Sequence, residues 1–272
     1  MRMPSQDCHW RALEPTIPIA DALQRPAPPG FMPGLGVLDE LTGGIRPGDV
    51  WVVEGPAGVG VSMLVLQLAT AGLRSGRSAA VVCGHLPVPV QVARLASQIG
   101  RVRLSHLWPP DRSLDSGEQE RSTAARQQLA AWPLRLATGI FEVAADPGAA
   151  MRLVGGGTTP AVLVIDTVAA EFGNVPDQCQ RLVRKLVEAC GFPGTALILG
   201  HRRPGVTELD RTGGLLLDLA DVVLSLSAPA ADGASPLLVR KNRWGSQGPV
   251  PDVVAQFHFA RLAAFERRTQ SL

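Results

Sequence analysis

The stretch Glu54-Gly55-Pro56-Ala57-Gly58-Val59-Gly60-Val61-Ser62 decides how the rest of the chain is interpreted. The apolar run at residues 50–53 comes directly before it and predicts a buried strand over residues 49–54. An apolar helix is predicted after it, because leucines recur at Leu64, Leu66, Leu68 and Leu73. A glycine-rich turn between a strand and a helix is typical of a phosphate-binding loop, in which backbone N–H groups and the helix N-terminus surround phosphate groups.

This loop departs from the phosphate-binding pattern G-x-x-x-x-G-K-[ST] at one position. Gly55, Gly60 and Ser62 match the pattern, whereas Val61 stands where the lysine is expected. Valine carries no charge and no donor, so a charge-assisted bond worth about 1.5–3 kcal/mol is lost. We expect nucleotide binding to be weakened by about tenfold to hundredfold, and phosphoryl transfer to lose more. The alternative is a tight α/β turn that binds no ligand.

The composition is that of a globular protein, with 46% hydrophobic and 18% charged residues among 272. The net charge of +2 gives no general affinity for nucleic acid, so any basic surface has to be local. The four cysteines share no C-x-x-C spacing, which argues against a zinc site and a disulfide framework. Since the sequence has no signal peptide and no apolar run of about 18 residues, we expect a soluble, cytoplasmic protein without membrane contact.

Two regions are expected along the chain. Seven prolines at residues 1–33 predict an extended N-terminal arm, and residues 34–272 form the core. Within the core, buried strands alternate with helices such as the amphipathic segment 88–99; the strands are expected at residues 79–83, 161–166, 196–199, 221–226 and 237–240. This alternation predicts an α/β fold, with a mostly parallel sheet covered by helices on both faces. Residues 253–265 predict one or two antiparallel edge strands.

Several polar residues fall at the ends of these strands. Asp166 closes an apolar strand, where a Walker-B carboxylate reaches Mg²⁺; the alternative is a cap on the next helix. His85 and His201 each follow a buried strand, at the edge where ligands collect in parallel sheets. The turn at residues 240–245 (RKNRWG) contains arginines that can reach a neighbouring subunit's γ-phosphate, or that lie on a solvated turn.

Together these segments resemble the C-terminal, RecA-like motor domain of the DnaB family of replicative helicases. The resemblance covers about residues 34–265; it is carried by residues 36–49 (GVLDELTGGIRPGD), the glycine-rich loop, residues 81–97, 162–166 and 215–221 (LLLDLAD), and the K-N-R-x-G turn at 241–245. The RadA and circadian-clock ATPases share the first two segments but match the last turn less well. The resemblance implies a P-loop NTPase fold that takes ATP and Mg²⁺.

The family's functional residues carry over only in part. The resemblance assigns nucleotide binding to the loop residues Gly55, Pro56, Ala57, Gly58, Val59, Gly60, Val61 and Ser62. It assigns Mg²⁺ to Ser62 and Asp166, and it assigns to Lys241 and Arg243 a catalytic contact with the nucleotide of the neighbouring subunit. Three positions are changed: the loop lysine is Val61, the water-activating glutamate falls at His85 or Gly84, and the glutamine that senses the γ-phosphate is His201.

The sequence therefore predicts a degenerate, DnaB-like pseudo-ATPase in which ATP and Mg²⁺ binding is weak or lost. It acts through self-association, a hexameric ring by resemblance, or through an active helicase partner in DNA replication or repair. The alternative is an active ATP-dependent DNA helicase module in which Arg46, Arg74, Arg77 or His201 replaces the lysine. A scaffold that binds no nucleotide is a third interpretation.

Single-stranded DNA is a further expected partner, through loops that line the central channel in this family. These loops correspond to residues 169–180 and 202–214; Arg202, Arg203 and Arg211 are the candidate contacts. Glu208 and Asp210 lie among them, which leaves a net charge of about +1, a weak footprint for a phosphate backbone.

Overall fold

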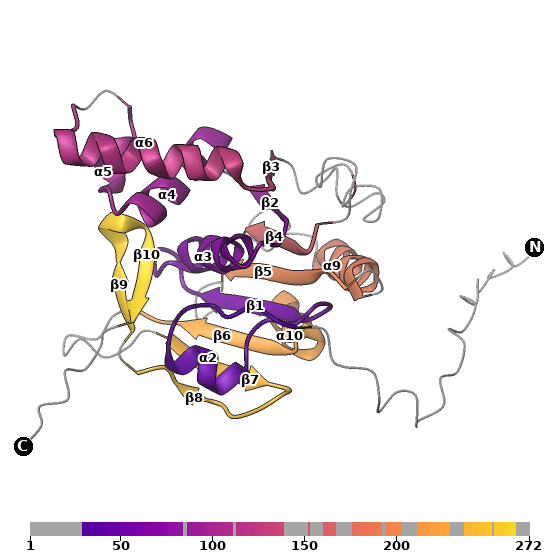
Figure 1. Ribbon diagram of the computed structural model, residues 1–272. Helices are drawn as coiled ribbons and strands as arrows, with labels where there is room; N and C mark the ends of the chain where they lie inside the picture. The colour runs from indigo at the N-terminus through magenta and orange to yellow at the C-terminus, as the bar shows by residue number, and fades with distance from the viewer. Residues whose placement is uncertain are drawn as a thin grey trace, which may run out of the picture.

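The computed structural model describes residues 29–83, 86–110, 113–138, 152, 160–166, 176–191, 194–202, 211–228, 237–251 and 253–264. Within these residues, an eight-stranded sheet has the order β3-β2-β4-β5-β1-β6-β7-β8 (Figure 1). The strands from β3 to β6 are parallel, and β7 and β8 continue the sheet in antiparallel pairing. The predicted α/β fold with a mostly parallel sheet is confirmed.

The bounds of the strands are β1 Val50–Gly55, β2 Ala79–Cys83, β3 Leu134–Thr138, β4 Val162–Asp166, β5 Ala196–Arg202, β6 Val222–Leu226, β7 Leu237–Asn242, β8 Gly248–Pro249, β9 Val253–Gln256 and β10 Arg261–Ala264. The helices are α2 Val37–Thr42, α3 Val61–Arg74, α4 Val88–Gly100, α5 Leu104–Leu107, α6 Ser116–Ala131, α9 Pro176–Gly191, α10 Arg211–Leu219 and the 3-10 turn η1 Phe257–Phe259. No helix in the described residues combines the length and apolarity needed to cross a bilayer.

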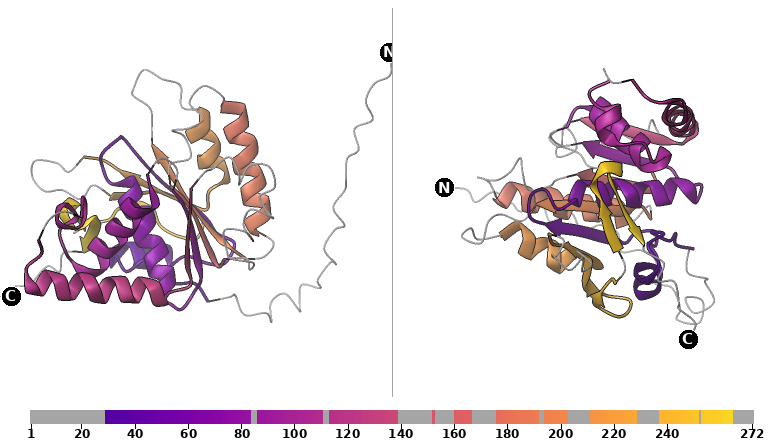
Figure 2. Two further views of the ribbon diagram at one scale, coloured as in Figure 1. Left: turned by 90° about the horizontal axis from the view of Figure 1, so that it is seen from above. Right: turned by 90° about the vertical axis from the view of Figure 1, so that its left-hand side faces the viewer.

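The sheet has a hydrophobic cluster on each face, because the inner strands are apolar throughout and successive side chains point to opposite sides. One cluster joins Trp51 and Val53 of β1 to α3. The other joins Val50 and Val52 of the same strand to α9 and α10. Figure 2 shows α9 and α10 on one side of the sheet and α3 on the other, so helices cover both faces as predicted.

The C-terminal segment differs from its predicted place. Strands β9 and β10 form a separate two-stranded sheet and are not edge strands of the main one. This hairpin packs on α3, and η1 at its turn contacts α4 and α5 (Figure 1). Gln67 of α3 holds β10 through both polar atoms of its side-chain amide, because Nε2 donates to the Leu262 carbonyl (2.9 Å) and Oε1 accepts from the Leu262 N–H (2.8 Å). Gln67 therefore helps to fix where the hairpin lies.

The packed fold begins before residue 34, where the core was expected to start. Phe31 is buried, and its backbone exchanges two hydrogen bonds with Ile45 (2.9 and 2.8 Å). The guanidinium carbon of Arg77 lies over the Phe31 ring, 5.6 Å from the ring centre. The last residues of the proline-rich region thus belong to the folded core; residues 1–28 lie outside the described part of the chain.

Candidate nucleotide site

The glycine-rich turn follows β1 at the carboxyl edge of the sheet and leads into α3. Gly58 and Gly60 have φ values of 83° and 106°, which glycine adopts without the strain that other residues meet. A Cβ atom on Gly55 would lie 2.7 Å from Val59 Cγ2 and 2.8 Å from the Leu226 carbonyl oxygen, so this position requires glycine as well. The turn therefore has the tight backbone that close approach to a phosphate needs.

The first turn of α3 faces this loop without a capping side chain. The first hydrogen bond of the helix runs from the Leu64 N–H to the Gly60 carbonyl (3.0 Å), so the N–H groups of Val61, Ser62 and Met63 come before it. Such amides, together with the positive end of the helix dipole, favour an anion.

Val61 stands where the sequence pattern places a lysine, and it is buried. Its side chain is buried, with 8% of the residue exposed, and it belongs to the cluster that packs α3 on the sheet. The loop itself therefore contributes backbone donors and the Ser62 hydroxyl to the site, but no positive charge.

A cavity of about 240 Å³ adjoins the turn. Its lining consists of loop and α3 residues together with four other elements: Pro56, Ala57, Gly58, Gly60, Val61, Ser62 and Met63, then Arg94 of α4, Leu104 of α5, Arg202 of β5, and Phe257 and Ala260 of the C-terminal hairpin. Gln98 fixes the hairpin here by donating to the carbonyl oxygens of Met63 (2.9 Å) and Ala260 (2.5 Å).

The basic residues at this cavity are not those proposed as substitutes for lysine. Arg94 and Arg202 line it, whereas Arg46, Arg74, Arg77 and His201 do not. Arg94 was missed as a site residue because it lies within a helix, away from every strand end, and no motif in the sequence singles it out.

Asp166 lies at the end of β4 but does not line the cavity. It is 3% exposed, and its Oδ2 accepts a hydrogen bond from the side-chain amide of Gln91 (3.1 Å). Of the two predicted Mg²⁺ ligands, Ser62 therefore lines the cavity, whereas Asp166 is buried and bonded to Gln91 of α4. Within the described residues, no group of three or more His, Cys, Asp or Glu side chains could hold a metal ion.

A row of polar side chains runs beneath the loop on the face covered by α9 and α10. Glu54 comes directly before Gly55, and His201 and Ser225 are its register partners on β5 and β6. Glu54 is 2% exposed; its Oε1 accepts from Ser225 Oγ and forms an ion pair with Arg240 Nη1 of β7 (2.8 Å). His201 is fully buried in the sheet. The Glu54 side chain thus ties the base of the loop to β6 and β7, in addition to the backbone pairing of β1 with β5 and β6.

Lys241 and Arg243 lie at the opposite edge of the sheet from the loop, because β7 runs antiparallel to β6 and Asn242 pairs with Val222. Both side chains make contacts within their own chain. Lys241 Nζ donates to the carbonyl oxygens of Leu217 (2.6 Å) and Asp218 (3.3 Å) of α10. Arg243 forms an ion pair with Asp221 (2.8 Å). Neither residue reaches the loop of its own chain.

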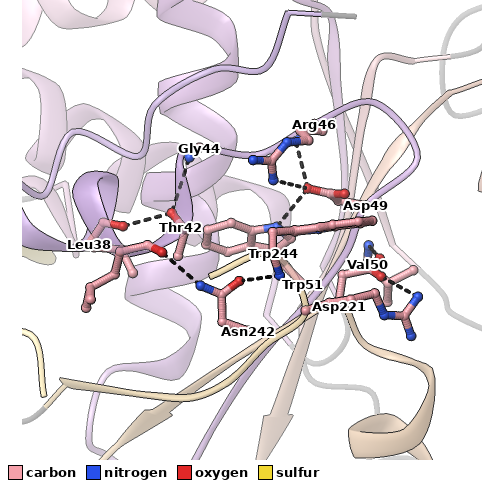
Figure 3. A network of polar contacts seen from close by, with 12 residues as sticks. Leu38, Thr42, Gly44, Arg46, Asp49, Val50, Trp51, Asp221, Asn242 and Trp244 are labelled. Atoms are coloured by element: carbon pink, nitrogen blue, oxygen red, sulfur yellow. Dashed lines mark hydrogen bonds and ion pairs between the residues drawn. The ribbon is translucent and has the colours of Figure 1, made fainter. Parts of the chain in front are cut away.

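The segments that carry the family resemblance meet at this edge (Figure 3). Asp49, which precedes β1, accepts from the Arg46 N–H (2.8 Å) and the Trp51 indole (3.4 Å), and Asp221 accepts from the Val50 N–H (2.8 Å). Burial raises the pKa of Asp49, with the nearby Asp221 adding to the effect and the hydrogen bonds opposing it. The guanidinium carbon of Arg46 lies over the exposed ring of Trp244, 5.5 Å from the ring centre.

Some predicted residues lie outside the described part of the chain. These are Gly84 and His85, Arg203, and residues 169–175 and 203–210 of the channel loops. Arg211 begins α10, and its side chain is not among those described. Arg202 is exposed and lines the cavity at the glycine-rich turn, so it lies at the candidate nucleotide site.

Two solved structures of ATPase and helicase proteins are similar to this chain. One, described as an ATPase domain, superimposes with a TM-score of 0.71 at 15% identity, over 91% of this chain and 95% of that one. A DnaB-like replicative helicase, described with its interactions with primase, gives 0.74 at 15% identity, over 91% of this chain and 66% of that one. No protein-family model and no curated protein matches the sequence.

These matches establish the class of the fold. It is that of RecA-like ATPase domains, with structural similarity to the ATPase domains of DnaB-like helicases. The chain spans 66% of the length of the DnaB-like helicase chain that it matches.

Proposed function

We propose that this protein is a DnaB-like pseudo-ATPase, which keeps the RecA-like fold and a weak nucleotide site but does not turn over ATP as a motor does. The observation that carries this proposal is Val61, whose side chain is buried in the core at the position of the phosphate-binding lysine. The burial of Asp166 supports it, because Mg²⁺-dependent phosphoryl transfer needs a carboxylate within reach of the metal.

In this proposal the protein acts in the cytoplasm by assembling with copies of itself, or with an active helicase in DNA replication or repair. Lys241 and Arg243 support this part, since they lie far from the loop of their own chain and next to an exposed tryptophan, Trp244. In a ring, these side chains would face the nucleotide of the neighbouring subunit. Single-stranded DNA is the polymer on which such an assembly would act.

A hydrolysis assay tests the proposal. Phosphate release from ATP with Mg²⁺ and single-stranded DNA is expected to stay at the level of a buffer control, for the native chain and for Asp166→Asn alike. Mixed with an active DnaB-type helicase, the native chain is expected to change that enzyme's rate, and Arg243→Ala is expected to abolish the change. Mg²⁺-dependent turnover by the native chain, lost in Asp166→Asn, would contradict the proposal.

One observation favours a second candidate, an active ATP-dependent helicase module. Arg94 and Arg202 bring two positive charges to the cavity, where an active enzyme would need a substitute for the lysine. This candidate predicts ATP turnover in the same assay. The turnover should fall when either arginine is substituted and rise when single-stranded DNA is added.

A further inference from the structure

Two arginine side chains from separate elements converge on the cavity of the glycine-rich turn. Arg94 comes from the middle of α4, and Arg202 ends β5, where it is the register partner of Gly55. Arg94 is half-buried and Arg202 is exposed. The residues that line the cavity include two positive charges and, within the described part of the chain, no carboxylate to balance them.

This arrangement changes how a phosphate group would be held. In the lysine-containing loop, one ammonium and one Mg²⁺ neutralise the phosphates. Here two arginine residues line the same space, and a guanidinium group can bind a phosphate through two parallel hydrogen bonds. The uncapped first turn of α3 adds backbone donors.

The residues present do not fit Mg²⁺. Mg²⁺ prefers octahedral oxygen coordination that includes one or two carboxylates. The Ser62 hydroxyl lines the cavity, but none of the described lining residues is an aspartate or glutamate. Asp166, the carboxylate that the resemblance assigns to the metal, is 3% exposed and accepts a hydrogen bond from Gln91.

We propose that this cavity binds the polyphosphate group of a nucleotide without Mg²⁺, with Arg94 and Arg202 supplying the charge that lysine and metal supply elsewhere. The inference deepens the proposed function, because it rests on the same site and states how that site holds its ligand. Binding without a metal would also explain how a nucleotide can be held but not hydrolysed.

The size of the cavity indicates which part of the nucleotide it holds. Its volume of about 240 Å³ is below the range of roughly 300–1,000 Å³ that encloses a whole small-molecule ligand. Phe257 closes one side, since a Cβ atom on Gly60 would lie 3.6 Å from Phe257 Cε1. We therefore expect the phosphates to account for most of the binding and the base to lie outside the cavity.

Calorimetric titration of ADP, ATP and pyrophosphate into the full chain tests the inference, in excess EDTA and in excess MgCl₂. All three are expected to bind in EDTA, and Mg²⁺ is expected to leave the affinity unchanged or weaken it. Arg94→Ala and Arg202→Ala are each expected to weaken binding by about tenfold to hundredfold. Arg202→Lys keeps the positive charge but loses the planar guanidinium that makes two parallel hydrogen bonds. Its affinity should therefore lie between that of Arg202→Ala and that of the native chain.

Arg74→Ala is the matched control, because Arg74 is exposed at the far end of α3 and does not line the cavity. Its affinity should equal that of the native chain, and thermal unfolding of each variant shows whether the fold is retained. Binding that requires Mg²⁺, binding that both arginine variants retain, or no binding to any of the three probes would overturn the inference. The pseudo-ATPase proposal fails separately, by Mg²⁺-dependent ATP turnover.

Discussion

The side-chain amide of Asn242 donates a 2.8 Å hydrogen bond to the backbone carbonyl of Leu41. The same amide nitrogen also donates to the Ser246 carbonyl (2.9 Å), and the Asn242 Oδ1 accepts from the Trp244 N–H (3.0 Å). One buried side chain thus shapes the β7–β8 turn and attaches it to α2, as Figure 3 shows. The two segments that make the sequence look DnaB-like are in contact in the folded chain, so part of their pattern serves the fold.

Replacing Asn242 with alanine is expected to destabilise the protein by about 1–3 kcal/mol, because it leaves the Leu41 carbonyl and the Trp244 N–H without their partner. Urea unfolding followed by tryptophan fluorescence measures the change. Gln247→Ala is the control in the same turn; its side chain is exposed, so the change should stay within about 0.5 kcal/mol. Equal stability of the two variants would show that the Asn242 hydrogen bonds contribute nothing.

The glycine of the same turn is explained by close packing. A Cβ atom on Gly245 would lie 2.8 Å from the Leu41 carbonyl oxygen and 3.1 Å from Asn242 Nδ2. Gly245→Ala is therefore expected to lower the midpoint of thermal unfolding, because either the turn or α2 has to move. Gly214→Ala in α10 is a matched control with open space around its Cβ, and it should be neutral or stabilising by up to about 1 kcal/mol. A reversed order of the two midpoints would contradict this account.

The Glu54–Arg240 ion pair predicts a non-additive double mutant. Arg240→Met leaves the buried Glu54 carboxylate without its cation, and an unpaired buried charge costs more than a pair that is absent. The single variant should therefore lose about 1–3 kcal/mol of stability, since Arg240 is about half exposed. The double variant Glu54→Gln with Arg240→Met should be more stable than Arg240→Met alone. Urea unfolding that gives simply additive losses would exclude this coupling.

Two buried cysteines predict an alkaline loss of stability. Burial raises the pKa of the Cys83 and Cys190 thiols from 9.0 to about 12; Asp166 adds to the effect at Cys83, and Arg94 opposes it. The stability that these thiols contribute is complete below pH 9 and is lost as the pH rises towards 12, because only the unfolded chain ionises in that window. Urea unfolding at several alkaline pH values measures this loss.

Thiol labelling provides the independent check of the same burial. In a background of Cys8→Ser and Cys179→Ser, a thiol reagent at pH 8 should leave the native chain unlabelled, since Cys83 and Cys190 are buried and protonated. Both should react once the chain is unfolded in urea. Rapid labelling of the native protein would show that one of the two sites opens to solvent.

Local pattern predicted the inner strands well, because a strand buried on both faces is apolar without interruption. Residues 79–83 and 88–99 correspond to β2 and α4. Strand β3 was not predicted; it is an edge strand of the described sheet, Arg135 interrupts its apolar positions, and its side chains are only partly buried. Strands β9 and β10 were predicted as edge strands, but their place on α3 depends on Gln67, which is remote in sequence.

The candidate site was predictable only where its residues are adjacent in the sequence. The glycine-rich turn and its missing lysine are adjacent residues, so the sequence displays them directly. Arg94 and Arg202 come together through the parallel pairing of β5 with β1 and the packing of α4 on α3, and no spacing in the sequence encodes that meeting. The same holds for Gln91, which covers Asp166 from a helix that precedes it by a long stretch of chain.

The position of β1 also has a consequence for the synthesis of the protein. This strand is the first of the described sheet to leave the ribosome, yet its two neighbours are β5 and β6, with Val50 paired to Leu197 and Trp51 to Val222. Until most of the chain has been made, a strand that is apolar over residues 50–53 and the glycine-rich turn attached to it have no partners. Such non-local pairing is slow and exposes aggregation-prone edges. The nascent chain is therefore at its most vulnerable over the very segment that later forms the centre of the molecule.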